Sequence, residues 1–184
     1  MFWRNKYMQC SVLTSADLEA ISAIEKASQA FPWSTQKLED CLRRFDAVCF
    51  GAKQNGVLYG YILGGTVLDE AEIWNFAVMP EFQRQGIVKA LLKYFLDFLT
   101  IKSVKQVFLE VRRSNQAAIA CYQKAGFRQV GLRKDYYPTE SGREDGILMC
   151  LVVGATGGRP VPGNGRPPVR PYIIWQGKRI GRVS

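Results

Sequence analysis

The order in which helical and strand-like apolar patterns follow one another constrains the fold of this chain more than any other feature. After an N-terminal strand and two helical patterns, three strand-like runs lie in succession within residues 47–79. A helix, a strand, a helix and two strands then follow within residues 85–152. A strand–helix–strand unit places its strands parallel, whereas directly connected strands run antiparallel. The order therefore predicts an α/β protein with a mixed sheet and helices on its faces.

Capping and turn residues indicate where these elements begin and end. Thr14 or Ser15 is expected to cap the first helix, and Ser34 the second. Asn55 and Gly56 separate two β-rich runs and form the strongest short-range hairpin signal in the chain. These signals support the element order independently of the apolar periodicity.

The composition favours one globular domain in a reducing compartment. The chain has 184 residues, of which 47% are hydrophobic, which suffices for a sizeable core. No apolar run approaches the roughly 20 residues that span a bilayer. The N-terminal residues lack a signal-peptide pattern. The five cysteines form no CxxC pair, so we expect free thiols, a cytoplasmic location and no membrane association.

The chain contains no histidine, and this limits its chemistry. Histidine-based triads and histidine-containing metal sites are excluded, so proton transfer falls to carboxylates, tyrosine, lysine, cysteine or water. No calcium-loop spacing is visible either, and we expect no metal site.

The positive charge is concentrated at the C-terminus. Of the net charge of +9, the six Lys/Arg and no acids of residues 154–184 contribute +6, which leaves +3 for residues 1–153. The tail also holds five of the eight prolines. We expect a domain at 1–153 and a basic Pro/Gly-rich tail at 154–184, which either makes weak contact with the ribosome or RNA or is a passive extension.

The segment "EFQRQGIVKALLKYFLDFL", residues 81–99, raises a specific question. Gln83, Arg84 and Gln85 precede Gly86, after which an apolar helix follows. One interpretation is an ordinary helix start with a polar first turn. The other is an anion cradle, because the first backbone N–H groups of a helix have no partner within it. The bulky Val88 is unexpected in a turn that approaches a phosphate closely.

Two motifs, in this order of elements, carry a family resemblance. "QRQG" opens the helix after the fourth strand, and "LEVRRSNQAAIACYQKAGF" follows one unit later. The chain thereby resembles the GNAT superfamily of acetyl-CoA-dependent N-acetyltransferases. The superfamily cradle is Gln/Arg-x-x-Gly-x-Gly/Ala, which Gln83 and Gly86 match and Val88 breaks. "AFPWS", "LDEAEIWNFAV" and "DYYPTESGRED" resemble the bacterial RimI branch, over residues 8–152.

The resemblance implies the GNAT acyl-CoA N-acyltransferase fold and direct transfer of an acetyl group to an amine. It places the general base at Glu110, at the end of the strand "VFLEV", and the general acid at Tyr122 in the next helix. From the residues alone, a strand-edge carboxylate and a core tyrosine remain the alternatives. Cys121 has no identifiable base partner, so a covalent mechanism is not expected.

Contacts to the co-substrate acetyl-CoA are expected mainly from the backbone. Phe76, Ala77 and Val78 are expected to offer main-chain groups to the pantetheine arm, as a peptide does when it adds to a sheet edge. The pyrophosphate is expected on the N–H groups at the helix start, namely those of Arg84, Gln85, Gly86, Ile87, Val88 and Lys89. The resemblance implies a further cofactor contact at Asn115, although helix capping explains this residue equally well.

The RimI branch acetylates the N-terminal alanine of the eighteenth small-subunit ribosomal protein, so the resemblance implies a ribosomal protein N-terminal peptide as substrate. It also implies that Trp33, Tyr136, Tyr137, Glu144 and Asp145 lie near the peptide site, where packing and turn formation are the alternative roles. Two other functions remain open. One is acetylation of a small amine, and the other, favoured by Val88 and the basic tail, is a degenerate acyl-CoA-binding, ribosome-associated module without turnover.

Overall fold

The computed structural model describes residues 8–153. The strands are β1 (Gln9–Val12), β2 (Ala47–Gln54), β3 (Val57–Val67), β4 (Glu70–Val78), β5 (Gln106–Arg112), β6 (Arg128–Thr139) and β7 (Gly142–Val152). The helices are α1 (Leu18–Ser28), α2 (Thr35–Leu42), α3 (Ile87–Ile101) and α4 (Gln116–Lys124), with short 3₁₀ helices η1 (Ser15–Asp17) and η2 (Pro80–Phe82). This is the predicted element order, and the α/β class is confirmed.

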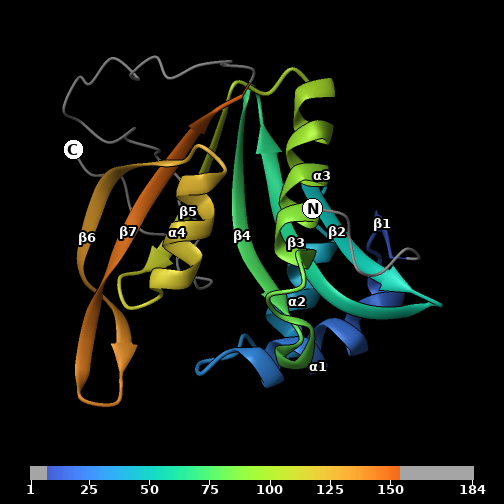
Figure 1. Ribbon diagram of the computed structural model, residues 1–184, viewed down its shortest axis with the longest axis horizontal. Helices are drawn as coiled ribbons and strands as arrows, with labels where there is room; N and C mark the ends of the chain where they lie inside the picture. Colours follow the sequence, from blue (N-terminus) through green and yellow to red (C-terminus); the bar gives the residue numbers. More distant parts are fainter. Residues whose placement is uncertain (1–7, 154–184) are drawn as a thin grey trace. The chain divides into compact units, whose positions relative to one another are not determined.

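The strands form one seven-stranded sheet in the order β1-β2-β3-β4-β5-β7-β6. Only β4 and β5 pair in parallel, and all other neighbours are antiparallel. The parallel pair results from the long α3 connection, and hairpins produce the antiparallel pairs β2–β3, β3–β4 and β6–β7 (Figure 1). The antiparallel pairs β1–β2 and β5–β7 are formed across longer connections that contain helices, and β7 lies between β5 and β6. The predicted mixed sheet is therefore confirmed, and its single parallel pair lies at the centre.

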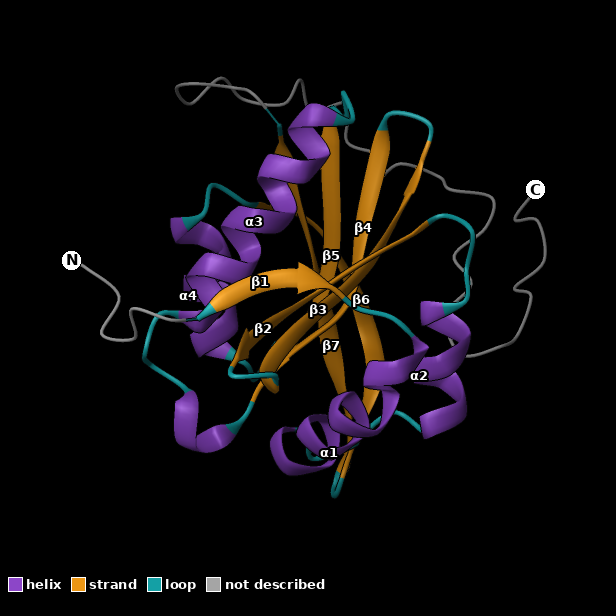
Figure 2. Cartoon of the chain, turned by 90° about the vertical axis from the view of Figure 1, so that its right-hand side faces the viewer, coloured by secondary structure: helices purple, strands orange, loops and turns teal. Residues whose placement is uncertain are grey.

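Helices cover both faces of the sheet (Figure 2). On one face, α3 and α4 pack over a core that includes Leu91, Phe95 and Tyr122 of these helices and Leu109 of β5. On the other face, α1 and α2 pack over a second core that includes Ile21 and Leu38. Side chains of one strand alternate between the two faces, so in β4 Ala77 belongs to the second core and its neighbour Val78 to the first.

The predicted helix starts are confirmed in part. Ser34 caps α2, since its side chain accepts a hydrogen bond from Lys37 N. Thr14 does form a capping box, but it caps η1 and not α1, which begins only at Leu18. The helix expected from Gln85 begins at Ile87, because Gly86 directly before it has a left-handed backbone conformation that does not fit an α-helix.

A buried carboxylate joins the elements of the α1–α2 face. Glu25 is only 1% exposed, although its side chain is polar. Its Oε1 accepts hydrogen bonds from the Trp33 backbone N–H at 2.9 Å and from Asn75 Nδ2 at 3.1 Å. Its Oε2 accepts a hydrogen bond from the Tyr61 hydroxyl. One side chain of α1 thus holds the α1–α2 loop, β3 and β4 together.

The remaining compositional expectations concern the thiols, the membrane and the tail. All five cysteines are free thiols, as expected, and Cys49 and Cys150 are buried. No helix among residues 8–153 is long and apolar enough to cross a membrane. The predicted tail at 154–184 lies outside the described residues, so the domain boundary stays a prediction.

The Glu25 network leads to a prediction about stability. Glu25→Ala would leave one buried donor (Tyr61) and two part-buried donors (Trp33 N–H and Asn75) without their acceptor, and each such loss costs about 1–3 kcal/mol. We therefore expect the free energy of unfolding to fall by about 3 kcal/mol or more in urea titrations. Glu19→Ala, an exposed position on the same helix, is the matched control and should stay within about 0.5 kcal/mol of the parent chain. Equal effects of the two substitutions would show that the network contributes nothing.

Candidate active site

The centre of the sheet is where β4 and β5 stop pairing. Their parallel register runs from Glu70 opposite Gln106 to Ile73 opposite Leu109. Beyond this point β4 continues for five residues to Val78 and β5 for three, without pairing to each other. The β4 edge that faces β5 is therefore available to a ligand that pairs like a strand.

The hydrogen-bond alternation of β4 shows which main-chain groups lie at this edge. Met79 N donates to Tyr59 O at 2.9 Å, so these two opposite residues form a hydrogen-bonded pair. In an antiparallel ladder every second pair is hydrogen-bonded, so the next such pair joins Ala77 and Tyr61. The N–H and C=O groups of Ala77 consequently face β3. Those of Phe76 and Val78 face the opposite way, towards the unpaired edge. Of the three residues expected to contact pantetheine, Ala77 is thus placed wrongly for main-chain contact.

The loop before α3 has the backbone form of an anion cradle. Arg84 has φ +59° and Gly86 has φ +88°, and both values lie in the left-handed region. Gly86 is the N-cap of α3 and supplies no side-chain cap, and the first bond into the helix runs from Ala90 N to Gly86 O at 3.1 Å. The N–H groups of Ile87, Val88 and Lys89 precede that bond and remain available as donors.

Charge and packing in the cradle fit the same role. The exposed side chains of Arg84 and Lys89 flank the helix start, where the helix dipole also favours an anion. Gln83 Nε2 donates to the Val78 carbonyl at 3.1 Å and thereby ties the loop to the end of β4. Val88 is partly buried and packs against the main core, so its bulk is directed into the protein. These residues fit the pyrophosphate of acetyl-CoA.

Gly86 is required by the backbone and not by its protein neighbours. We predict that the turn comes closest to the bound phosphate at this position, where a Cβ would intrude, and this stays a prediction. Within residues 8–153, no atom beyond Gly86 and its two chain neighbours lies within 4 Å of a Cβ built there. The constraint is φ +88°, which a residue with a side chain adopts only with strain.

Glu110 occupies a buried position at the end of β5. Its side chain is 4% exposed, and its Oε1 has no hydrogen-bond partner among the described residues. Burial raises the pKa of the Glu110 carboxyl, Arg133 and Tyr137 oppose this rise, and Glu72 adds to it. A Cβ at Gly146 would come within 3.2 Å of both Glu110 Cδ and Tyr137 Cε2, so the glycine permits the close packing. A carboxylate with a raised pKa and a free oxygen is suited to general-base chemistry.

Tyr122 lies on the opposite side of β5 from Glu110. It belongs to the core under α4, is 9% exposed, and its ring centroid is 5.7 Å from that of Phe127. Leu109 and Val111 point to that same core, and Glu110, which lies between them in the strand, points to the other face. Burial raises the pKa of Tyr122. Glu110 and Tyr122 therefore lie on opposite faces of β5.

Asn115 acts as a helix cap. Its Oδ1 accepts a hydrogen bond from Ala118 N at 3.1 Å, which satisfies a free donor of the first turn of α4. The capping role is therefore confirmed. The cofactor contact that the resemblance implies for Asn115 stays a prediction.

The α1–α2 loop and the β6–β7 hairpin meet at Arg112, the last residue of β5. The Arg112 guanidinium lies 4.9 Å from the Phe31 ring centroid and 4.5 Å from that of Tyr137. Its Nη1 also contacts Glu144 Oε1 at 2.9 Å. Arg112 thus joins the two segments that the resemblance places beside the peptide, and the cation–π contacts stabilise this arrangement.

The acidic residues of the hairpin are paired within the chain. Glu144 also accepts a hydrogen bond from Ser114 N at 2.9 Å, and Asp145 contacts Arg113 Nη1 at 3.0 Å. The pKa values of Glu144 and Asp145 are lowered, for Asp145 chiefly by a backbone hydrogen bond from Asp135. These carboxylates organise the hairpin, which is the turn role that the sequence left open, and their charge is largely compensated by arginine.

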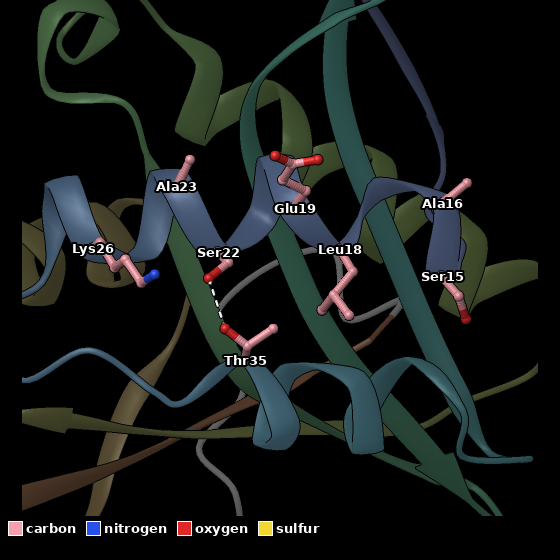
Figure 3. A pocket seen from close by; sticks show the side chains of 8 residues that line it. All are labelled: Ser15, Ala16, Leu18, Glu19, Ser22, Ala23, Lys26 and Thr35. Atoms are coloured by element: carbon pink, nitrogen blue, oxygen red, sulfur yellow. Dashed lines mark hydrogen bonds between the residues drawn. The ribbon is translucent and has the colours of Figure 1, made fainter.

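A separate hollow lies between η1, α1 and α2, away from the predicted site residues (Figure 3). Ser22 and Thr35 face each other across it, with 3.0 Å between their hydroxyl oxygens. Its lining consists of Ser15, Ala16, Leu18, Glu19, Ser22, Ala23, Lys26 and Thr35. It contains neither an unpaired buried carboxylate nor a cradle of backbone donors, so it is not the candidate active site.

Sequence reasoning missed two residues that the structure brings to the site. Arg133 of β6 contacts Glu110 across β7, and Glu25 holds the loop that carries Trp33. Neither had a local signal, because Arg133 occupies an unremarkable strand position and Glu25 resembles a solvated helix residue. The contact of Arg133 depends on the strand order β5-β7-β6, which local patterns do not encode.

These features define an acyl-CoA-dependent acyltransferase, and a family comparison agrees. Residues 16–127 match the model of the acetyltransferase (GNAT) family. The chain belongs to this family and is an acetyl-CoA-dependent N-acetyltransferase. The superfamily resemblance inferred from "QRQG" and the segment after it is therefore confirmed.

Relatives identify the branch of the family. The chain is 43% identical over 143 residues to the [ribosomal protein bS18]-alanine N-acetyltransferase of Escherichia coli K12, which covers 78% of this chain and 96% of that protein. The crystal structure of the ribosomal-protein-S18-alanine N-acetyltransferase from Escherichia coli superposes with a TM-score of 0.77 at 40% identity, over 84% of this chain and 99% of that one. The resemblance to the RimI branch is confirmed.

A more distant structure shows the same fold. Arabidopsis thaliana NAA60 has a TM-score of 0.70 at 18% identity, over 79% of this chain and 98% of that one. At this identity the similarity concerns the fold alone, and it confirms the predicted GNAT architecture.

The cradle generates a prediction about cofactor affinity. Gly86→Ala should weaken acetyl-CoA binding at least tenfold in calorimetric titrations, because a left-handed alanine costs about 1–2 kcal/mol and relaxation would redirect the N–H groups. Gly56→Ala is the matched control: Gly56 has φ +80° and, chain neighbours aside, no atom of the described residues within 4 Å of its Cβ position, but it lies in the β2–β3 turn. It should lose stability and keep its acetyl-CoA affinity. Unchanged affinity of Gly86→Ala would remove the cradle from the binding site.

A second prediction separates the two roles considered for Tyr122. Tyr122→Phe keeps the ring and its packing but removes the hydroxyl, so turnover should fall by roughly 10²-fold while the melting temperature changes little. Tyr94→Phe, on the solvent side of α3 at 41% exposure, is the control and should leave turnover unchanged. A lower melting temperature with full turnover per folded molecule would identify Tyr122 as a packing residue only.

Proposed function

We propose that this protein transfers the acetyl group of acetyl-CoA to the N-terminal alanine amine of ribosomal protein bS18. The observation that carries the proposal is the buried Glu110 carboxylate beside the unpaired β4 edge, in a chain that matches 96% of the Escherichia coli bS18-alanine enzyme at 43% identity. A match over nearly the whole relative includes both segments that flank the site, in addition to the cofactor cradle.

The proposed chemistry assigns one role to each group. Acetyl-CoA supplies the acetyl group as a thioester. The free Glu110 Oε1 accepts a proton from the attacking amine, directly or through water, as the new N–C bond forms. Tyr122 donates its proton to the departing thiolate sulfur as the C–S bond breaks. The main-chain groups of Phe76 and Val78 and the N–H groups at the start of α3 hold the cofactor.

An α-amino group suits this site. Its pKa of about 7.7–8.0 means that a substantial neutral fraction exists at physiological pH, whereas a lysine amine with a pKa near 10.4 is almost fully charged. A buried carboxylate base of modest strength is therefore sufficient. The position of Arg112 between Phe31 and Tyr137 supports entry of an extended peptide end between the α1–α2 loop and the hairpin.

The substrate also bears on location and on the tail. A ribosomal protein substrate is consistent with the cytoplasmic location expected from the sequence. Weak contact of the six basic residues of 154–184 with the ribosome or RNA stays a prediction, since the tail lies outside the described residues.

The test is acetylation of a synthetic peptide with the bS18 N-terminal sequence, followed by intact mass. We expect a gain of one acetyl group with the free amine and none with a peptide whose amine is already blocked. Spermidine serves as the small-amine comparison, and a higher kcat/KM for spermidine than for the peptide would contradict the proposal.

Glu110→Gln is the matched variant in this assay. It keeps the size of the side chain but not the basicity, so kcat should fall by roughly 10²–10⁴ while the affinity for acetyl-CoA remains. If the parent chain binds acetyl-CoA and acetylates neither amine, the degenerate binding module becomes the better description.

A further inference from the structure

Arg133 contacts one of the two oxygens of the Glu110 carboxylate. Arg133 Nε lies 3.2 Å from Glu110 Oε2, and the side chains are 24% and 4% exposed respectively. Glu110 Oε1 is buried and has no hydrogen-bond partner among the described residues. The two oxygens of the carboxylate are therefore not equivalent.

The position of Arg133 is itself fixed. Its guanidinium lies 4.9 Å from the ring centroid of Tyr136, a distance at which a cation–π contact is favourable. The register of β6 against β7 shifts between Arg133 and Tyr137, so the strand carries extra residues directly after Arg133. Such a bulge redirects side chains and is common next to functional sites.

Two residues of β7 hold the bulge. Arg143 donates from its guanidinium to the carbonyls of Asp135 and Tyr136. Asp145 accepts from the Asp135 N–H at 3.1 Å, and Asp135 has φ +50°. The strained backbone persists because several contacts define it together.

We propose that Arg133 is a positioning residue for Glu110: it binds Oε2, orients the carboxylate and leaves Oε1 as the proton acceptor. The proposal rests on the assignment of Glu110 as the base in the proposed function. The geometry carries it, because the Arg133 contact uses one oxygen of a buried carboxylate and leaves the other without a partner.

Among the groups that act on Glu110, Arg133 carries the positive charge that favours the ionised carboxylate. Glu72 of β4 and Tyr136 and Tyr137 of β6 are the other titratable groups that act on this carboxylate among the described residues. Burial, with a smaller contribution from Glu72, raises the pKa of Glu110, whereas the charge of Arg133 and, to a smaller extent, a hydrogen bond with Tyr137 lower it. Without Arg133, a larger fraction of Glu110 would be protonated and inactive as a base at neutral pH.

The first measurement is a direct titration that requires no substrate. In protein labelled with ¹³C-glutamate, the side-chain carboxyl signal of Glu110 is assigned by its absence in Glu110→Gln. We expect Arg133→Met to raise the Glu110 pKa by about one unit or more, since a neighbouring arginine lowers a carboxyl pKa by about 1–3 units. Arg133→Lys retains the charge and should bring the pKa back towards that of the parent chain.

The second measurement is the pH profile of kcat/KM with the bS18 peptide. Below the amine pKa the logarithm should rise with slope one, and below the Glu110 pKa with slope two, because both groups must then lose a proton. The pH at which the slope changes should rise by about one unit in Arg133→Met and recover in Arg133→Lys. Affinity for acetyl-CoA should remain unchanged in both variants.

Arg143→Met is the matched control, because it loosens the same bulge without removing the charge beside Glu110. It should keep the Glu110 pKa of the parent chain. An equal rise in Arg143→Met, or no rise in Arg133→Met, overturns the proposal. If Arg133→Met does not fold, Arg133→Gln replaces it in both measurements.

The two proposals fail separately. If the peptide is not acetylated but the carboxyl titration shows the expected rise, the assigned substrate is wrong and the Arg133–Glu110 coupling stands. If the peptide is acetylated and the titration shows no rise, Arg133 is only a structural residue of β6.

Discussion

The arrangement of the α1–α2 face depends on one buried carboxylate. Glu25 accepts hydrogen bonds from the Trp33 backbone, Asn75 and Tyr61, and it thereby connects a helix, a loop and two strands. Burial, with a further contribution from Glu25, raises the pKa of Tyr61, so its hydroxyl acts as a stable donor. Asn75 belongs to the part of β4 beyond its pairing with β5, so the network also supports the edge at which the cofactor is proposed to bind.

The loss of pairing between β4 and β5 determines how the chemistry can be divided. Once the strands separate, groups from both faces of the sheet have access to the space between them. Glu110 comes from the face of α1 and α2, and Tyr122 from the face of α3 and α4. The proposed general base and the proposed general acid are thus kept apart by the sheet itself, and each has its own environment. Arg133 is near the base alone, and a close-packed apolar core surrounds the acid.

The predictable parts of the site are those with short-range causes. The cradle could be read from Gln83 to Gly86, because left-handed turns and free helix N–H groups depend on a few consecutive residues. The caps at Ser34 and Asn115 were predicted for the same reason. Only the structure shows that the backbone conformation of Gly86 requires a glycine, with no described residue beyond its chain neighbours within 4 Å of a Cβ built there. The orientation of Ala77 was also unpredictable, because it depends on the pairing of β4 with β3.

The sequence by itself determined the element order and the mixed sheet, and it predicted the cradle and, through resemblance, the roles of Glu110 and Tyr122. These features follow from apolar periodicity, turn chemistry and short motifs, all of which act over a few residues. The tertiary structure alone decided that Glu25 is buried with three donors and that Arg133 binds one oxygen of Glu110. Both contacts join residues far apart in the chain. They arise only when the sheet takes the order β5-β7-β6 and α1 packs on β3 and β4, so no local pattern contains them.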